Sequence, residues 1–171
     1  MREISYKDLS FNPMDMIANE WWLITAGNKD RGYNTMTGSW GHLGSIWAHG
    51  GGAPTAVMYI RPQRFTKEFV DREDFFTLSV FDEKYKKQLA YLGRHSGRDS
   101  DKISEAGLTP LFIDDTAAFE EAKLILVCRK VYHSPILESG FVDKSYVDEY
   151  YPDRDFHELY IGEIVKVMIN D

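Results

Sequence analysis

Two arginines and a threonine that follow a short apolar run are the residues best suited to chemistry. Residues 56–60 (AVMYI) are apolar and β-prone. Arg61, Arg64 and Thr66 come next, so we expect these side chains where a strand leaves a sheet. A guanidinium group binds phosphate oxygens through paired, charge-assisted hydrogen bonds, and a hydroxyl can add one more. The alternative is a solvated turn with surface charges, a common place for arginine.

A run of small polar residues upstream favours a ligand site over a plain turn. It consists of Asn34, Thr35, Met36, Thr37, Gly38, Ser39 and Trp40. Ser, Thr and Asn side chains hydrogen-bond nearby backbone, and glycine lets the backbone approach a ligand closely. The run can therefore offer N–H and C=O groups to the edge of a flat heteroaromatic ring. Trp40 and Trp47 add apolar area, although either fits a core equally well. The two segments together suit a phosphorylated aromatic cofactor.

A second basic stretch lies at residues 94–102 (RHSGRDSDK). Its candidate ligand-binding residues are Ser96, Gly97, Arg98 and Lys102. We expect Gly97 to end the preceding helix in the left-handed conformation. The nearby cations either contact the same phosphate or are only solvated, as many surface cations are.

The overall charge argues against some partner classes. With 20 basic and 27 acidic residues, the 171-residue chain carries a net charge of -7, which argues against a general nucleic-acid or anionic-membrane surface. Residues 61–102 differ, because they hold ten Lys and Arg against eight Asp and Glu. The positive excess therefore lies where the anion site is expected. The length favours one domain, residues 1–171.

The number and spacing of cysteine, histidine and apolar residues argue against a disulfide-bonded, metal-binding, secreted or membrane-spanning protein. The single cysteine, Cys128, permits no internal disulfide or multi-cysteine metal site, and its apolar surroundings predict a buried, inert thiol. The histidines show no metal-ligand spacing. The first sixteen residues have no signal-peptide core, and no apolar run reaches membrane-spanning length. We therefore predict a cytoplasmic protein that binds no membrane and no nucleic acid.

The hydrophobic pattern predicts a mainly β fold with a few peripheral helices. Strands are expected at residues 21–26, 35–40, 44–48, 56–60, 75–81, 124–132 and 159–169, and helices at 66–71 and 85–95. Thr66 is the expected cap of the first helix. Gly50 to Gly52 and Pro54 are expected to form a connecting loop. Residues 143–155 have no clear period and suggest an excursion over the barrel or against a partner subunit. Such a strand set favours a closed or nearly closed barrel.

Motifs of other enzyme classes are missing from the sequence. It contains no GxGxxG after a strand, no P-loop and no GxSxG. Instead, an ordered set of short motifs resembles the flavin reductase-like family of FMN-binding split barrels, among whose members is flavoredoxin. The set is Asn34, Met36-Thr37, Ser39-Trp40-Gly41, Tyr59-Ile60-Arg61-Pro62, Arg64, Thr66, Ser96-Gly97-Arg98-Asp99, Lys102, His157 and Tyr160-Ile161-Gly162-Glu163-Ile164. The likeness extends from about Trp21 to Ile169.

The resemblance implies a homodimeric, Greek-key split β-barrel that binds FMN noncovalently near the subunit interface. It implies that residues 34–40 line the isoalloxazine ring and ribityl chain. It implies that Arg61, Arg64 and Thr66 hold the phosphate, while Ser96, Gly97, Arg98 and Lys102 close the site. Hydride transfer to a flavin requires no acid–base pair, so no catalytic side chain is named.

Three functions remain open at this point. The first is an FMN-dependent oxidoreductase that takes electrons from NAD(P)H or from a redox partner protein. The second is a non-catalytic FMN-binding module, a store or a sensor. The third is a split barrel that binds another phosphorylated ligand, such as pyridoxal phosphate, although the aromatic segment offers no evident reactive lysine.

Overall fold

The computed structural model describes residues 1–48 and 51–170. Its strands are β1 (Arg2–Ile4), β2 (Trp22–Asn28), β3 (Gly32–Gly38), β4 (Gly41–Ala48), β5 (Gly51–Ile60), β6 (Phe75–Val80), β7 (Pro110–Ile113), β8 (Thr116–Phe119), β9 (Leu124–Pro135) and β10 (Glu158–Ile169). Its helices are α1 (Pro13–Asp15), α2 (Phe65–Arg72), α3 (Lys86–Arg94), α4 (Lys102–Ala106) and α5 (Ser145–Tyr150), and short 3-10 and π turns lie between them. The predicted mainly β composition is confirmed.

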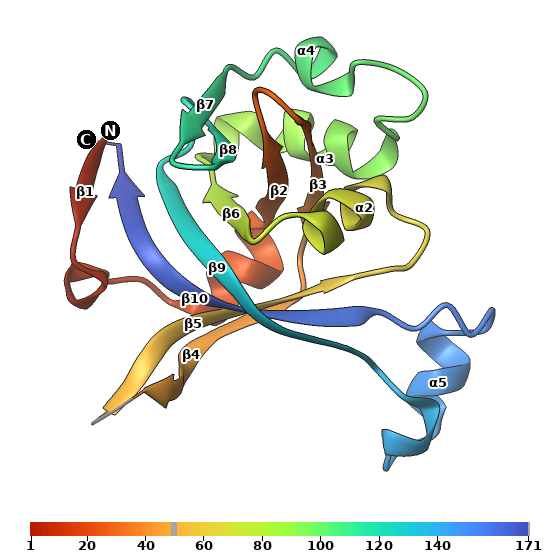
Figure 1. Cartoon of the computed structure of the whole chain (residues 1–171). Coiled ribbons are helices and arrows are strands. Elements are labelled where there is room, and N and C mark those ends of the chain that lie inside the picture. The colour runs from red at the N-terminus through yellow and green to blue at the C-terminus, as the bar shows by residue number, and fades with distance from the viewer. Residues whose placement is uncertain (49–50, 171) are drawn as a thin grey trace.

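One antiparallel sheet dominates the molecule. Its order is β3-β2-β6-β9-β10-β5-β4, with β1 paired to β10, and β7 and β8 form a separate hairpin. The long strands β9 and β10 run through the centre, and β2, β3 and β6 lie beneath helices α2 and α3 (Figure 1). The β4–β5 hairpin diverges from β10 near the middle of that strand and extends away from this body, and α5 lies beyond the opposite end of β5 (Figure 1).

The two faces of the sheet pack into different parts of the core because side chains alternate along a strand. Trp22 and Ile24 belong to one buried cluster with Met58, whereas Leu23 belongs to a second. Leu89 and Leu92 of α3 join the second cluster. Burying one leucine side chain contributes about 1.5–3 kcal/mol, so this helix is fixed by its apolar face. The predicted helix at 85–95 is therefore confirmed.

Two predictions are wrong, namely that Thr66 caps a helix and that Gly97 ends one in the left-handed conformation. Helix α2 begins at Phe65 with Arg64 as its N-cap, so Thr66 lies inside the first turn and is not the cap. Helix α3 ends at Arg94, and its C-cap His95 is extended. Gly97 lacks the expected positive φ. A Cβ there would stand 2.3 Å from Asn34 Oδ1, so this glycine provides space for a neighbour rather than a left-handed turn.

The prediction that the glycines and Pro54 form a loop is also wrong for the residues that the structure describes. Gly51 and Gly52 open strand β5, and Pro54 lies within it, while Gly50 falls outside the described residues. Pro54 pairs with Ser45 of β4, but the pairing of β5 with β10 stops at Thr55. Proline is tolerated there because one side of the strand has no ladder bond to lose.

Residues 143–155 contain the helix α5, which the absence of a period did not predict. Within the helix only Val147 is buried, so no apolar stripe marks it in the sequence. Tyr151, directly after the helix, is buried as well. Cys128 lies fully buried in β9, and burial raises the pKa of its thiol, as expected for an inert cysteine.

Candidate functional site

A cavity of about 270 Å³ opens at the N-terminal end of α2, and we call it the cation pocket. It lies between β3, the loop before α2, and the segment that joins α3 to α4. It is lined by Asn34, Met36, Gln63, Arg64, Phe65, Thr66, Arg94, His95, Ser96 and Lys102. Three of these side chains are cations, and none is acidic. The lining therefore has the composition of an anion site.

The three cations have no carboxylate partner among the described residues. Arg64 donates from Nη1 to the carbonyl of Gly93 at 2.9 Å. Lys102 donates from Nζ to the carbonyls of Leu92 at 3.0 Å and His95 at 2.9 Å. Its side chain is only 3% exposed. Burial, and then the charge of Arg64, lower the pKa of Lys102 to about 8. A buried charge without a counterion costs free energy, and a bound anion would offset that cost.

The backbone adds donors to the same pocket. The N-cap Arg64 makes no side-chain capping hydrogen bond to α2. The first N–H groups of an uncapped helix are unsatisfied, and the helix dipole favours a negative charge there. Thr66, in the first turn, is 1% exposed, and its hydroxyl accepts a hydrogen bond from Asn34 Nδ2 at 2.8 Å. This bond joins β3 to α2 and leaves the Thr66 hydroxyl proton available to a ligand.

A second cavity, of about 180 Å³, adjoins the first, and we call it the aromatic pocket. It shares Met36 and Arg64 with the cation pocket, and its other lining residues are Thr37, Gly38, Ser39, Trp40, Tyr59, Arg61 and His157. The rings of Trp40 and His157 lie 4.8 Å apart between centroids. The two pockets thus form one polar-to-aromatic site along β3.

His157 is a neutral member of the aromatic pocket. Burial, and then the charge of Arg61, lower its pKa to about 4. Its Nδ1 lies 2.9 Å from the hydroxyl of Tyr151. With Tyr151 donating to Nδ1, the imidazole would carry its proton on Nε2.

Arg61 is separated from the cation pocket that sequence reasoning assigned to it. Its guanidinium forms an ion pair with Asp155 and donates to the carbonyl of Tyr150 at 2.8 Å. Gln63 donates to the same carboxylate at 2.8 Å. Arg61 therefore ties the α5 segment to the wall of the aromatic pocket. Arg64, and not Arg61, is grouped with Thr66 and Lys102.

Three predicted residues, Arg98, Thr35 and Gly97, lie apart from both pockets. Arg98 forms an ion pair with Glu68, donates to the carbonyl of Gln63 at 3.2 Å, and covers the Phe65 ring at 4.6 Å. The hydroxyl of Thr35 is buried, 2.8 Å from that of Thr25. Strand alternation turns Thr35 away from the face of Asn34 and Met36, so its side chain lines none of the described cavities. Gly97 lies beside Arg98 in a neighbouring groove.

The other predicted residues are brought together. Asn34, Met36, Arg64, Thr66, Ser96 and Lys102 line the cation pocket, and Met36, Thr37, Ser39, Trp40, Arg61 and Arg64 line the aromatic pocket. Sequence reasoning missed Arg94, His95, Phe65, Gln63, Tyr59 and His157 as lining residues. Arg94 and His95 stood inside the basic stretch, and Tyr59 and His157 stood inside the family motif set, so these four left a signal. Phe65 and Gln63 carried none.

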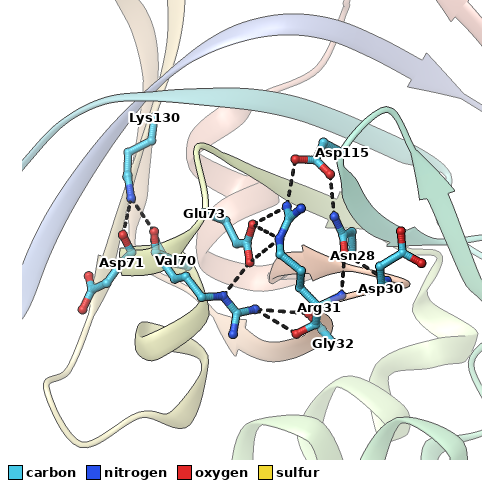
Figure 2. Close-up of polar contacts among 10 residues, drawn as sticks. Asn28, Asp30, Arg31, Gly32, Val70, Asp71, Glu73, Asp115 and Lys130 are labelled. Carbon is cyan, nitrogen blue, oxygen red and sulfur yellow. Dashed lines mark hydrogen bonds and ion pairs between the residues drawn. The ribbon is translucent and has the colours of Figure 1, made fainter.

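The opposite end of α2 holds a contrasting charge network (Figure 2). Glu73, only 5% exposed, binds Arg31 at 2.7 Å and Arg72 at 2.6 Å. Arg31 also binds Asp115 at 2.8 Å, and Asn28 donates to Asp115 at 2.5 Å. The Arg31 hydrogen bond lowers the pKa of Glu73. This network joins the β2–β3 turn, the end of α2 and the β7–β8 turn, and its charges satisfy one another.

The described part of the chain holds neither a metal-binding cluster nor a membrane-spanning helix. Its His, Cys, Asp and Glu side chains form no cluster that could hold a metal ion. None of its helices is long and apolar enough to cross a membrane.

Comparisons with known proteins agree with this architecture. Flavoredoxin of Desulfovibrio vulgaris superposes with a TM-score of 0.67 at 18% identity, covering 100% of this chain and 78% of that one. An FMN-binding protein from Thermus thermophilus superposes with a TM-score of 0.66 at 17% identity, covering 100% of this chain and 83% of that one. A split-barrel domain protein from Shewanella frigidimarina superposes with a TM-score of 0.67 at 20% identity, covering 96% of this chain and 77% of that one. No curated protein matches the chain.

These likenesses confirm the split-barrel fold. The model of the flavin reductase like domain matches residues 14–171, which is nearly the whole chain. The order of motifs along the sequence, the antiparallel barrel and this match agree, and the chain belongs to the flavin reductase-like family.

Proposed function

We propose that this chain binds FMN noncovalently and acts as a flavin-dependent oxidoreductase. The observation that carries the proposal is a pocket with three cations and no carboxylate, placed at a helix N-terminus and continuous with an aromatic pocket. A phosphate suits the first and a flat ring suits the second. Neighbours described as FMN-binding proteins support the same ligand.

The side chains divide between the two ends of the ligand. Arg64, Arg94, Lys102 and Thr66 would hold the phosphate, with the α2 N–H groups beside them. Asn34, Met36 and Ser39 would run along the ribityl chain and ring, next to Trp40 and His157. When bound, the flavin supplies hydride or single-electron transfer, and the protein supplies orientation and electrostatics. Lys102, with a pKa of about 8, keeps most of its positive charge at neutral pH.

The electron donor in this proposal is NAD(P)H or a redox partner protein. A neighbour from Streptomyces globisporus, described as an NADH:FAD oxidoreductase, has a TM-score of 0.63 at 14% identity and covers 88% of this chain and 75% of its own. The test is anaerobic mixing of the FMN-loaded protein with NADH and with NADPH. Loss of the flavin absorbance near its long-wavelength band supports the reductase. If neither nucleotide bleaches the flavin, NAD(P)H is excluded as the electron donor. The remaining possibilities are then a redox partner protein as donor, or a storage role for the protein.

A chromophore assay decides between FMN and another phosphorylated ligand. The purified protein is denatured, and the released compound is identified by its spectrum and mass. Released FMN supports the proposal. Release of a pyridoxal phosphate, or failure to bind added FMN, would overturn it.

We also propose that the functional unit is a homodimer in the cytoplasm. Apolar side chains are exposed on β4 and β9, namely Ile46, Trp47, Val131 and Tyr132. Trp47 is 62% exposed, and its ring contacts that of Tyr132 at 6.0 Å. Such a patch fits an interface better than a solvated surface. Light scattering after gel filtration tests it: we expect twice the chain mass for the wild type and a monomer for Trp47→Lys.

A further inference from the structure

Four side chains join helix α2 to strand β10, and we call them the α2 clamp. They are Lys67 and Asp71 on α2, and Glu158 and Tyr160 on β10. Lys67 Nζ lies 2.8 Å from Glu158 Oε2 and 2.7 Å from Asp71 Oδ2. The hydroxyl of Tyr160 donates to Asp71 Oδ1 at 2.6 Å. The four groups therefore form one continuous chain of polar contacts.

The spacing of the clamp residues matches the helix to the strand. Lys67 and Asp71 are four residues apart on α2, which is a rise of about 6 Å along a helix. Glu158 and Tyr160 are two residues apart on β10, so they share one face of the strand and span about 7 Å. The two contacts between the elements therefore have nearly equal spacing on both sides. Together they fix the direction of α2 along β10 as well as its position, which a single contact cannot do.

The clamp contacts are largely shielded from water. The side chains of Lys67 and Glu158 are 17% and 16% exposed, and Tyr160 is fully buried. His133 of β9 contacts the other carboxylate oxygen, Glu158 Oε1, so both oxygens of Glu158 have a partner. Ion pairs that are partly buried are screened much less than exposed ones. Loss of one member should therefore loosen α2 against β10.

The clamp residues are adjacent in the sequence to residues that line the two pockets. Lys67 follows Thr66 of the cation pocket, and Glu158 follows His157 of the aromatic pocket. Lys67 and Glu158 themselves are outside the sets of described residues that line either pocket. The ion pair between them can therefore set the distance between the pockets without contacting a ligand in either one.

We propose that the α2 clamp positions the phosphate end of the site relative to its ring end, and so selects a ligand with one separation between phosphate and ring. A ligand that occupies both pockets gains from this fixed spacing, because its second contact is intramolecular. A ligand that occupies one pocket alone gains nothing from it. The four clamp residues are positioning residues, and the proposal rests on the FMN-binding role given to the two pockets above.

The test compares FMN with two ligands that each suit one pocket, riboflavin and inorganic phosphate, by titration calorimetry of the full-length apoprotein. Glu158→Gln keeps the size of the side chain and removes its charge. It should weaken FMN binding about tenfold and change the riboflavin and phosphate affinities less than about twofold. Lys67→Met should have the same effect. The double variant should lose little more than either single variant, because both changes break one ion pair.

Two further variants control for the fold and for charge. Lys67→Arg keeps the positive charge and should keep the FMN affinity within about twofold of the wild type. Asp114→Asn breaks a different ion pair to β10, the 2.8 Å contact between Asp114 and Lys166, and should leave all three affinities unchanged. Thermal denaturation shows which variants are folded. If Glu158→Gln does not fold, Tyr160→Phe removes only the hydroxyl that binds Asp71 and carries the same expectation.

The outcomes that overturn the clamp differ from those that overturn the proposed function. Equal losses for FMN and riboflavin would place the effect in the aromatic pocket alone, and equal losses for FMN and phosphate would place it in the cation pocket alone. Either result overturns the clamp, as does an unchanged FMN affinity in every clamp variant. All three leave FMN binding by the wild type intact. Absence of FMN binding in the wild type overturns the proposed function instead, and the clamp with it.

Discussion

The two ends of helix α2 carry opposite electrostatic arrangements within eight residues of chain. After its C-terminus, Glu73 is buried between Arg31 and Arg72, and Asp115 completes the pairing (Figure 2). At its N-terminus, Arg64 and Lys102 face a cavity whose lining includes no carboxylate. Both ends are rich in arginine or lysine. They differ in whether these cations have carboxylate partners.

The charges at the paired end stabilise the fold, whereas we expect the unpaired cations of the cation pocket to bind a ligand. A paired network satisfies its own hydrogen bonds, and removing one partner from it is costly. Cations grouped without counterions repel one another, so they lower the stability of the free protein. Their counter-charge is expected to arrive with the ligand.

The largest expected effect is at the paired end. Glu73→Ala leaves Arg31 and Arg72 without their shared partner and should lower the free energy of unfolding by about 2–4 kcal/mol. Both arginines are about half exposed, so water compensates for part of the loss. Urea denaturation measures the change, with Glu83→Ala on the exposed turn before α3 as control. A loss as small as that of the control would mean that the network is only a surface feature.

The second effect is at the unpaired end and has the opposite sign. Lys102→Met removes a buried, unpaired charge, so the free protein should be unchanged or up to about 1 kcal/mol more stable. The FMN affinity should fall about thirtyfold, because a charge-assisted hydrogen bond to phosphate is worth about 1.5–3 kcal/mol. Riboflavin, which lacks the phosphate, should bind both proteins alike. Equal losses for FMN and riboflavin would place Lys102 away from the phosphate.

The third prediction contrasts two arginines that are near neighbours in the sequence. Arg64→Ala should weaken FMN binding about tenfold with little change in stability. Arg61→Ala should cost stability instead, because it leaves Asp155 unpaired and frees the α5 segment. Fluorescence titration with FMN, alongside thermal denaturation, measures both variants. A larger FMN loss for Arg61→Ala would show that the ion pair with Asp155 gives way to the phosphate.

The smallest effect is a pH dependence that Lys102 should impose. Its folded-state pKa of about 8 lies below its ordinary value of 10.5, so the unfolded chain binds more protons between these two values. The contribution of Lys102 to stability therefore rises with pH from about 8 to 10.5. Over the same window the lysine loses charge, and FMN affinity should fall several-fold from pH 7 to 9.5. Titrations of wild type and Lys102→Met test this, since the variant should show neither trend.

Local chemistry in the sequence determined much of the architecture. The apolar runs at 21–26, 75–81, 124–132 and 159–169 became β2, β6, β9 and β10, because short apolar runs rich in β-branched and aromatic residues favour buried strands. The spacing of Leu89 and Leu92 likewise specified α3. Helix α5 escaped prediction because a helix with one buried residue leaves no hydrophobic period.

The sequence by itself also identified the segments that form the site, since Asn34, Arg64, Thr66 and Lys102 stand in stretches whose composition suits a phosphate. Which of the arginines is free was decided by the tertiary structure. Asp155 neutralises Arg61, Glu68 pairs with Arg98, and Glu73 pairs with Arg31 and Arg72. These partners lie up to 94 residues apart. A side chain's charge is local, but its counterion depends on which strands and helices the fold brings together.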